Sequence, residues 1–206
     1  MNRTRAAGFV GLTFLALATL AMLALHRARP DLDPVRTPIS FYGRGSGAWL
    51  LTAGLLGSGL GVIAISWVLE RRLNRRVGPW LIAVGGSALI VAATVRSDLW
   101  FPWQHRLTLT GWVHAGAAGL AAFAFPIGAL LVTRDERKAT GSGLLNRFLD
   151  ILIFIFLVTL AAFGGVTLLF IALGRSVGFL GLAERILMAL AVAWLVVASR
   201  EPASSA

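Results

Sequence analysis

The chain has 206 residues, 57% of them hydrophobic and only 14% charged, with a mean hydropathy of +0.80. A soluble domain usually carries about 25% charged residues, so this composition excludes a soluble globular protein and predicts a membrane protein with short loops. The net charge of +10 comes mostly from basic residues that flank apolar runs, which indicates contact with anionic lipid headgroups and argues against nucleic-acid binding. The sequence contains no cysteine, which excludes disulfide bonds and thiolate metal sites.

Six apolar runs, taken in chain order, predict six transmembrane helices. A helix needs about 20 apolar residues to cross a hydrocarbon core of ~30 Å, and five of the runs meet this length easily. The last run does so only if Glu184 and Arg185 lie at the membrane interface. We therefore predict an all-α polytopic membrane protein, a six-transmembrane-helix bundle that forms one membrane domain over residues 1–206. The spans are expected at about 6–25, 48–69, 77–95, 107–132, 151–173 and 179–198.

The first run could be a cleaved signal peptide or a transmembrane helix. A signal peptide has an apolar core of about 7–15 residues, followed by small residues at a cleavage site. This run is longer and continues directly into the segment from His26 to Pro30, which is a poor cleavage site. We expect an uncleaved span.

The basic residues are divided unequally between the two sides of the predicted bundle. Eleven Lys and Arg residues fall on the side of the termini and eight on the opposite side, and the cluster from Arg71 to Arg76 directly adjoins two spans. Because basic residues are enriched in cytoplasmic loops, we expect both termini in the cytoplasm. Arginine supplies all but one of the 19 basic residues and Ala and Gly are abundant, which favours a GC-rich bacterium and its cytoplasmic (inner) membrane.

Several residues mark the ends and faces of the predicted helices. Tryptophan prefers the membrane–water interface, and the positions expected there are Trp49, Trp67, Trp80, Trp112 and Trp194. Asp150 is expected in the first turn of the fifth helix, where the helix dipole stabilises a carboxylate. Gly57 and Gly61 form a GxxxG pattern, which predicts close helix packing either within the chain or in a homo-oligomer.

Polar residues collect on the predicted outer side. All three histidines lie there, and so do four acidic residues: His26, His105, His114, Asp31, Asp33, Asp98 and Glu184. The first outer loop, residues 26–47, is rich in proline and glycine, so it is either an ordered cap over the bundle or a solvated loop. If the protein has a functional site, we expect it to face outward.

His114 is the one histidine placed securely inside a predicted span. A polar residue at that depth should face the bundle or a cavity, as part of a site or as a buried histidine bonded to a neighbour. His26, Asp98, His105 and His114 have the chemistry to bind zinc, but their spacing forms no metal motif. No metal is therefore favoured, and the sequence leaves the cofactor undetermined.

Two short motifs resemble those of a known family. The first is Arg-Pro-Asp-Leu-Asp-Pro-Val-Arg followed by Pro-Ile-Ser, within residues 26–42. The second is Asp98 followed by Thr108, Gly111 and His114 in a Thr-x-x-Gly-x-x-His pattern. Together they resemble the bacterial and archaeal membrane family called domain of unknown function 998, over about residues 8–132. The resemblance implies a compact multi-helix membrane protein with Asp98 and His114 in an outward-facing polar cluster, and it supplies no reaction.

Two functions remain open at the level of sequence. The first is an accessory protein that binds a lipid, a pigment or a partner membrane subunit, with Ser40, Arg44, Asp98, His105 and His114 as ligand-binding candidates. The second is a metal-dependent hydrolase that acts on lipid at the outer face, with Asp98 and His114 as catalytic candidates. A coupled transporter is disfavoured because the inner halves of the spans are almost free of ionisable residues.

Overall fold

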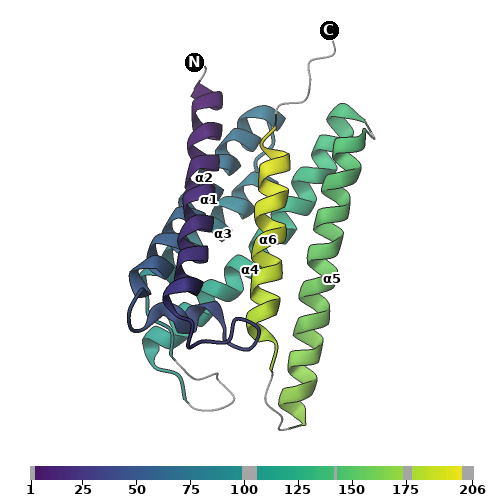
Figure 1. The fold of residues 1–206 in the computed structure, drawn as a ribbon. Helices are drawn as coiled ribbons and strands as arrows, with labels where there is room; N and C mark the ends of the chain where they lie inside the picture. The colour runs from purple at the N-terminus through teal and green to yellow at the C-terminus, as the bar shows by residue number, and fades with distance from the viewer. Residues whose placement is uncertain (1–2, 99–105, 142, 174–177, 201–206) are drawn as a thin grey trace.

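Six long α-helices account for most of the chain that the computed structural model describes, which is residues 3–98, 106–141, 143–173 and 178–200 (Figure 1). All six are long and apolar enough to cross a membrane. No strand occurs in the described ranges, so the predicted all-α, six-helix membrane fold is confirmed. The elements are α1 (Arg3–Ala28), the short 3-10 helix η1 (Ile39–Gly43), α2 (Ala48–Leu73), α3 (Val77–Thr94), α4 (Leu109–Thr140), α5 (Leu144–Ala172) and α6 (Leu180–Ala198).

Successive helices run in opposite directions, so the start of α1 and the end of α6 lie at the same end of the bundle (Figure 1). We call this the terminal end. The opposite end holds the loop of residues 29–47 with η1 and the first turns of α4 and α6, and we call it the cap end. The even number of helices fixes this arrangement, whichever way the bundle faces in the membrane.

The fourth and fifth helices extend beyond the apolar runs that predicted them. α4 continues to Thr140 and α5 already begins at Leu144. The added segments contain Arg, Glu, Lys and Leu, which all favour helix, so the helices continue past the membrane interface. Asp150 was expected in the first turn of α5, and this prediction is wrong. It lies well inside the helix, where its carboxylate pairs with Arg137 at 3.5 Å.

Glycines bring the first three helices into backbone contact. A Cβ atom added to Gly59 would lie 2.6 Å from the backbone oxygen of Gly86 on α3. A Cβ atom added to Gly61 would lie 2.9 Å from the backbone oxygen of Gly11 on α1, and Gly57 also faces α1. The GxxxG pattern of α2 is therefore covered within the chain, and it permits the close approach typical of membrane helices.

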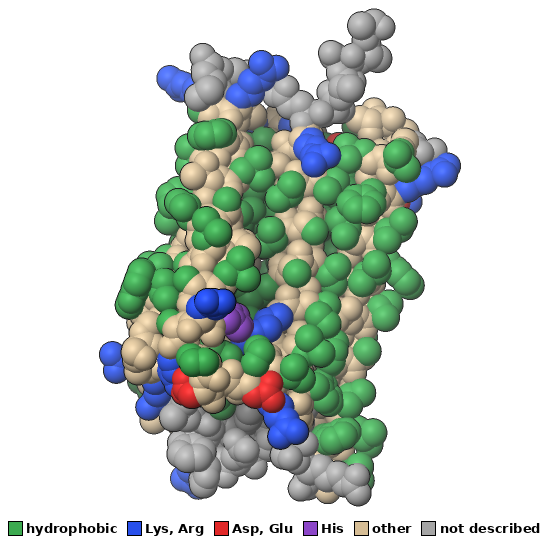
Figure 2. Space-filling model, in the orientation of Figure 1, with side chains coloured by type: hydrophobic (Ala, Val, Ile, Leu, Met, Phe, Trp, Pro, Cys, Tyr) green, Lys and Arg blue, Asp and Glu red, His purple; other side chains and the backbone are tan. Residues whose placement is uncertain are grey.

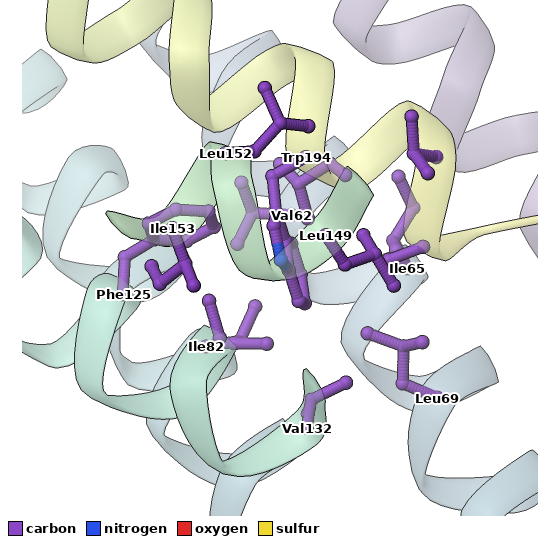
Figure 3. Close-up of a cluster of buried hydrophobic side chains, with 14 of the residues drawn as sticks. Val62, Ile65, Leu69, Ile82, Phe125, Val132, Leu149, Leu152, Ile153 and Trp194 are labelled. Atoms are coloured by element: carbon purple, nitrogen blue, oxygen red, sulfur yellow. The ribbon is translucent and has the colours of Figure 1, made fainter. Parts of the chain in front are cut away.

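The hydrophobic core lies toward the terminal end and is centred on Trp194 of α6. Figure 3 shows the indole surrounded by apolar side chains from α2, α3, α4 and α5. Trp194 is only 1% exposed, stacks edge-to-face on Phe125 and donates from Nε1 to Oγ1 of Thr133 at 3.2 Å. Trp194 thus packs inside the bundle near the end of α6 and is not exposed to the headgroup region. Trp49, Trp80 and Trp112 are exposed, as interfacial residues should be.

The outer surface of the bundle is a broad apolar band. Figure 2 shows hydrophobic side chains along the helices, with charged side chains gathered toward the two ends. α5 contributes exposed residues such as Phe154, Leu168 and Leu169. Because a band of this kind is unstable in water, it supports the conclusion that the chain is a multi-pass membrane protein.

Candidate functional site

The loop of residues 29–47 forms an ordered cap that is bound to the first turns of α6. Leu182 donates its backbone N–H to the oxygen of Val35 at 2.9 Å, and Arg185 donates from Nη1 to the oxygen of Thr37 at 3.1 Å. Gly181 allows this contact, since an added Cβ there would lie 2.6 Å from the backbone oxygen of Pro34. Of the two alternatives for this loop, the structure shows the ordered cap.

His26 helps to hold the cap through both of its ring nitrogens. Nδ1 lies 2.5 Å from the oxygen of Met22, and Nε2 lies 2.8 Å from Nε of Arg185. Because the arginine can only donate, Nε2 must accept, and the proton of the neutral ring sits on Nδ1. The Arg185 guanidinium also lies 5.4 Å from the ring centre of Tyr42, within cation–π range. His26 therefore positions the cap and has no nitrogen left to bind a metal.

Asp98 fixes the start of α4. Its Oδ2 accepts from the backbone N–H of Thr108 at 2.7 Å, and its Oδ1 accepts from the Thr108 hydroxyl at 3.0 Å. Thr108 in turn caps the helix by accepting from the N–H of Gly111 at 3.1 Å. Gly111 has no side chain that would collide with Asp98, since an added Cβ would lie 2.7 Å from its Cγ. These contacts give Asp98 a structural role at a helix N-terminus.

Arg44 and Ser40 connect the cap to the segment after α3. Arg44 donates from Nη2 to the backbone oxygen of Ser97 at 3.1 Å. Ser97 donates from its hydroxyl to the backbone oxygen of Ser40 at 3.2 Å. The Ser40 hydroxyl makes no hydrogen bond to another described residue, and Ser40 lines a cavity beneath the cap.

His114 is buried one turn inside α4, against the end of α3. Its Nδ1 lies 3.0 Å from the oxygen of Ala92 and 2.9 Å from that of Val95. Carbonyls in the last turn of a helix lack partners within the helix, and here the ring satisfies them. Since these oxygens accept, Nδ1 carries the proton, and Nε2 keeps a lone pair that has no hydrogen-bond partner among the described residues. His114 lines the same cavity as Ser40.

The cavity has a volume of about 400 Å³ and lies between η1 and every helix except α1. Ser40, His114 and Glu184 supply its polar groups, all from the cap end. The rest of the wall is apolar and reaches along α4 to Phe125, which is roughly 16 Å from His114 at the rise of an α-helix. A cavity of this size is typical of small-molecule sites, and this one is polar at one end and apolar along its length.

The side of the cavity formed by α4 consists of small residues. Ala118, Gly119, Ala121 and Ala122 all lie in this wall. A Cβ atom added to Gly119 would meet nothing within 4 Å, whereas Gly128 near the terminal end packs against the backbone of Gly78. α4 is therefore tightly packed near the terminal end and borders open space near the cap end.

Glu184 is the site residue that sequence reasoning missed. We expected it to be a charge at the membrane interface, but it lies in the cavity wall and accepts the backbone N–H of Ile39 through Oε2 at 2.6 Å. A carboxylate inside an otherwise apolar span was the available signal. It could not be used, because nothing in the sequence shows that the cap folds onto α6.

The metal-ligand candidates are dispersed in the structure. His26 is bonded to Arg185, Asp98 to Thr108, and His114 to the end of α3. No group of three His, Asp or Glu side chains suited to a metal occurs within the described ranges. His105 lies outside the described residues.

A family model supports the resemblance seen in the motifs and extends it. No curated protein and no solved structure matches the chain. The family model matches residues 7–201, so it includes the fifth and sixth helices, whereas the motifs carried the resemblance only to about residue 132. Within that match, each residue of the Thr-x-x-Gly-x-x-His motif has a distinct structural place. Thr108 caps α4, Gly111 leaves room for the Asp98 side chain, and His114 lines the cavity. The chain belongs to the family described as "Protein of unknown function (DUF998)".

Proposed function

We propose that the protein binds a lipid-like amphiphile in the cavity beneath the cap. The observation that carries the proposal is the division of the cavity wall into a polar end and a long apolar part. The polar head would lie at Ser40, His114 and Glu184, and the hydrocarbon chain would extend between α3, α4 and α6 toward Phe125. This is the accessory, ligand-binding function in its lipid form.

The occupant of such a cavity inside a membrane has to match both its apolar wall and its polar end. Its apolar wall offers water no hydrogen-bond partners, so ordered water is a poor occupant there. Its polar groups would be costly to bury without partners, so a plain hydrocarbon chain is also a poor occupant. An amphiphile satisfies both parts at once. The small side chains of α4 around Gly119 leave space through which a chain could enter from the bilayer.

Lipid retention by the purified full-length chain tests this proposal. Native mass spectrometry in mild detergent, followed by lipid extraction, should show a bound amphiphile. Gly119→Leu puts a large side chain into the cavity and should lower retention at least about tenfold, a loss of roughly 1.4 kcal/mol in binding free energy. Gly165→Leu is the matched control, because Gly165 faces open space on α5 and does not line the cavity. Equal retention by the wild type and both variants would refute the proposal.

The setting of this function is also part of the proposal. The cap end would face outward from a bacterial cytoplasmic membrane, because the clustered arginines of residues 71–76 adjoin the terminal end of α2 and α3. The chain contains no cysteine, so Val35→Cys, on the exposed part of the cap, provides a single labelling site. A membrane-impermeant maleimide should label it in intact cells. Labelling only after the cells are broken would show that the cap end faces the cytoplasm and would refute the proposed orientation.

A further inference from the structure

We propose that the head of the bound amphiphile is a hydrogen-bond donor, a hydroxyl or an ammonium group, and that carboxylate and phosphate heads are rejected. This inference rests on the proposed function and specifies the class of its ligand. It follows from the lone pairs and protons that the cap end of the cavity presents.

His114 presents an acceptor. Its Nδ1–H is directed at the oxygens of Ala92 and Val95, at 3.0 and 2.9 Å. The neutral imidazole has only one N–H, so Nε2 offers a lone pair. The ring cannot exchange these roles by turning over, because Nδ1 would then lose both carbonyl partners. A ligand that meets Nε2 must bring its own proton.

Glu184 presents a second acceptor. One carboxyl oxygen, Oε2, is held by the N–H of Ile39 at 2.6 Å. The other oxygen has no hydrogen-bond partner in the part of the chain that the structure describes. In its ionised form this carboxylate accepts hydrogen bonds only, and it repels a second anion. The Ser40 hydroxyl can donate or accept, so it fits either kind of head.

Among the described residues, no arginine lines the cavity, neither from the cap nor from α6. Arg185 contacts His26, Thr37, Gly181 and the face of Tyr42, and it does not line the cavity. Arg44 is bonded to the backbone of Ser97 and is also absent from the wall. A carboxylate or phosphate head would therefore meet the acceptors of His114 and Glu184 with no Lys or Arg in the described wall to pair with it. Polar groups of the head and of the wall would then stay buried without hydrogen-bond partners.

Competition among amphiphiles that share one chain length tests the inference. The probes are hexadecanol, hexadecylamine, palmitate and methyl palmitate, offered in pairs to the purified full-length chain and measured by native mass spectrometry. Hexadecanol and hexadecylamine should be retained at least about tenfold over palmitate and methyl palmitate, because an unpaired buried acceptor costs on that order. Equal retention of all four would overturn the headgroup inference and leave the proposed function standing. Retention of none would refute the proposed function itself.

Glu184→Gln gives an independent arm. Glutamine can still accept from Ile39 through its oxygen, but it replaces the free acceptor with an NH₂ donor. The preference for hexadecanol over palmitate should fall at least about tenfold. Among the four amphiphiles, the retention of hexadecylamine should fall most. Glu70→Gln is the matched control, since Glu70 pairs with Arg76 at the terminal end and should leave the preference unchanged. An unchanged preference in Glu184→Gln would contradict the role of Glu184, and the wild-type competition decides the headgroup class even if this variant folds poorly.

Discussion

Gly181→Ala should detach the cap from α6. Gly181 follows directly after the first residue of α6, and an added Cβ would collide with the backbone oxygens of Thr37 and Pro34. Backbone atoms cannot move aside as a flexible side chain can, so the cap itself has to shift. The contacts at risk are the bonds from Leu182 to Val35 and from Arg185 to Thr37, and the bond between Ile39 and Glu184.

The expected loss follows from those three hydrogen bonds. Each contributes roughly 0.5–1.5 kcal/mol, so losing all three costs about 1.5–4.5 kcal/mol. Replacing glycine by alanine in a helix gains about 1 kcal/mol, which leaves a net loss of roughly 0.5–3.5 kcal/mol. In a chain of this size that corresponds to a fall in Tm of roughly 1–14 °C. Thermal unfolding in detergent, followed by tryptophan fluorescence, measures it.

Accessibility of the cap gives a second measurement of the same change. Ile39 is 6% exposed beneath the cap, and Ile39→Cys places a single thiol there, because the natural chain has no cysteine. Adding Gly181→Ala should raise its rate of maleimide labelling several-fold. Gly178→Ala is the matched control, since a Cβ at Gly178 meets open space. The reasoning fails if Gly181→Ala and Gly178→Ala behave alike in both Tm and labelling.

Two further predictions concern the core and the surface of the cap. Trp194→Phe keeps the aromatic contact with Phe125 but loses the bond to Thr133, so the free energy of unfolding should fall by about 1 kcal/mol, while Trp112→Phe on the exposed face should change little. The Arg29 guanidinium, hydrogen-bonded to Asp31, lowers the pKa of that carboxyl. The small contribution of this ion pair to stability is present above the unfolded pKa of Asp31, about 3.9. It is lost as the pH falls through the lower pKa that Asp31 has in the folded state. The difference in Tm between wild type and Asp31→Asn should therefore be present at about pH 6 and vanish in strong acid; a difference that grows on acidification would contradict this assignment.

The number and order of the helices could be predicted from sequence because the bilayer imposes a length on every apolar run. The ends of α4 and α5 could not, because apolarity marks the membrane boundary and helix continues into polar segments wherever propensity allows. Trp194 shows the same limit in another form. Its place near the end of a span is visible in the sequence, but the direction in which the helix face points is fixed by tertiary packing.

The candidate site was predicted in part for a related reason. His114 could be found because an ionisable residue inside an apolar run needs a partner or a cavity. Asp98 was expected in the same cluster, and in the structure its carboxylate is hydrogen-bonded to Thr108 at the start of α4. Glu184 was missed as a site residue, since its partner Ile39 is 145 residues away along the chain. Long-range contacts of this kind leave no periodic pattern in a single sequence.

The cap and the cavity form one unit, because the residues that close the bundle also line its interior. Glu184 holds the backbone of Ile39 with one carboxyl oxygen and faces the cavity, and Ile39 and Ser40 line that cavity from the cap side. A donor head bound at Glu184 therefore sits against the same carboxyl group that holds the cap in place. Occupancy of the cavity and order of the cap must then be linked, since a ligand that binds only the closed form stabilises that form by mass action. The Ile39→Cys thiol should consequently be labelled more slowly by maleimide when hexadecanol is bound. A labelling rate unaffected by saturating hexadecanol would show that occupancy of the cavity and order of the cap are not linked.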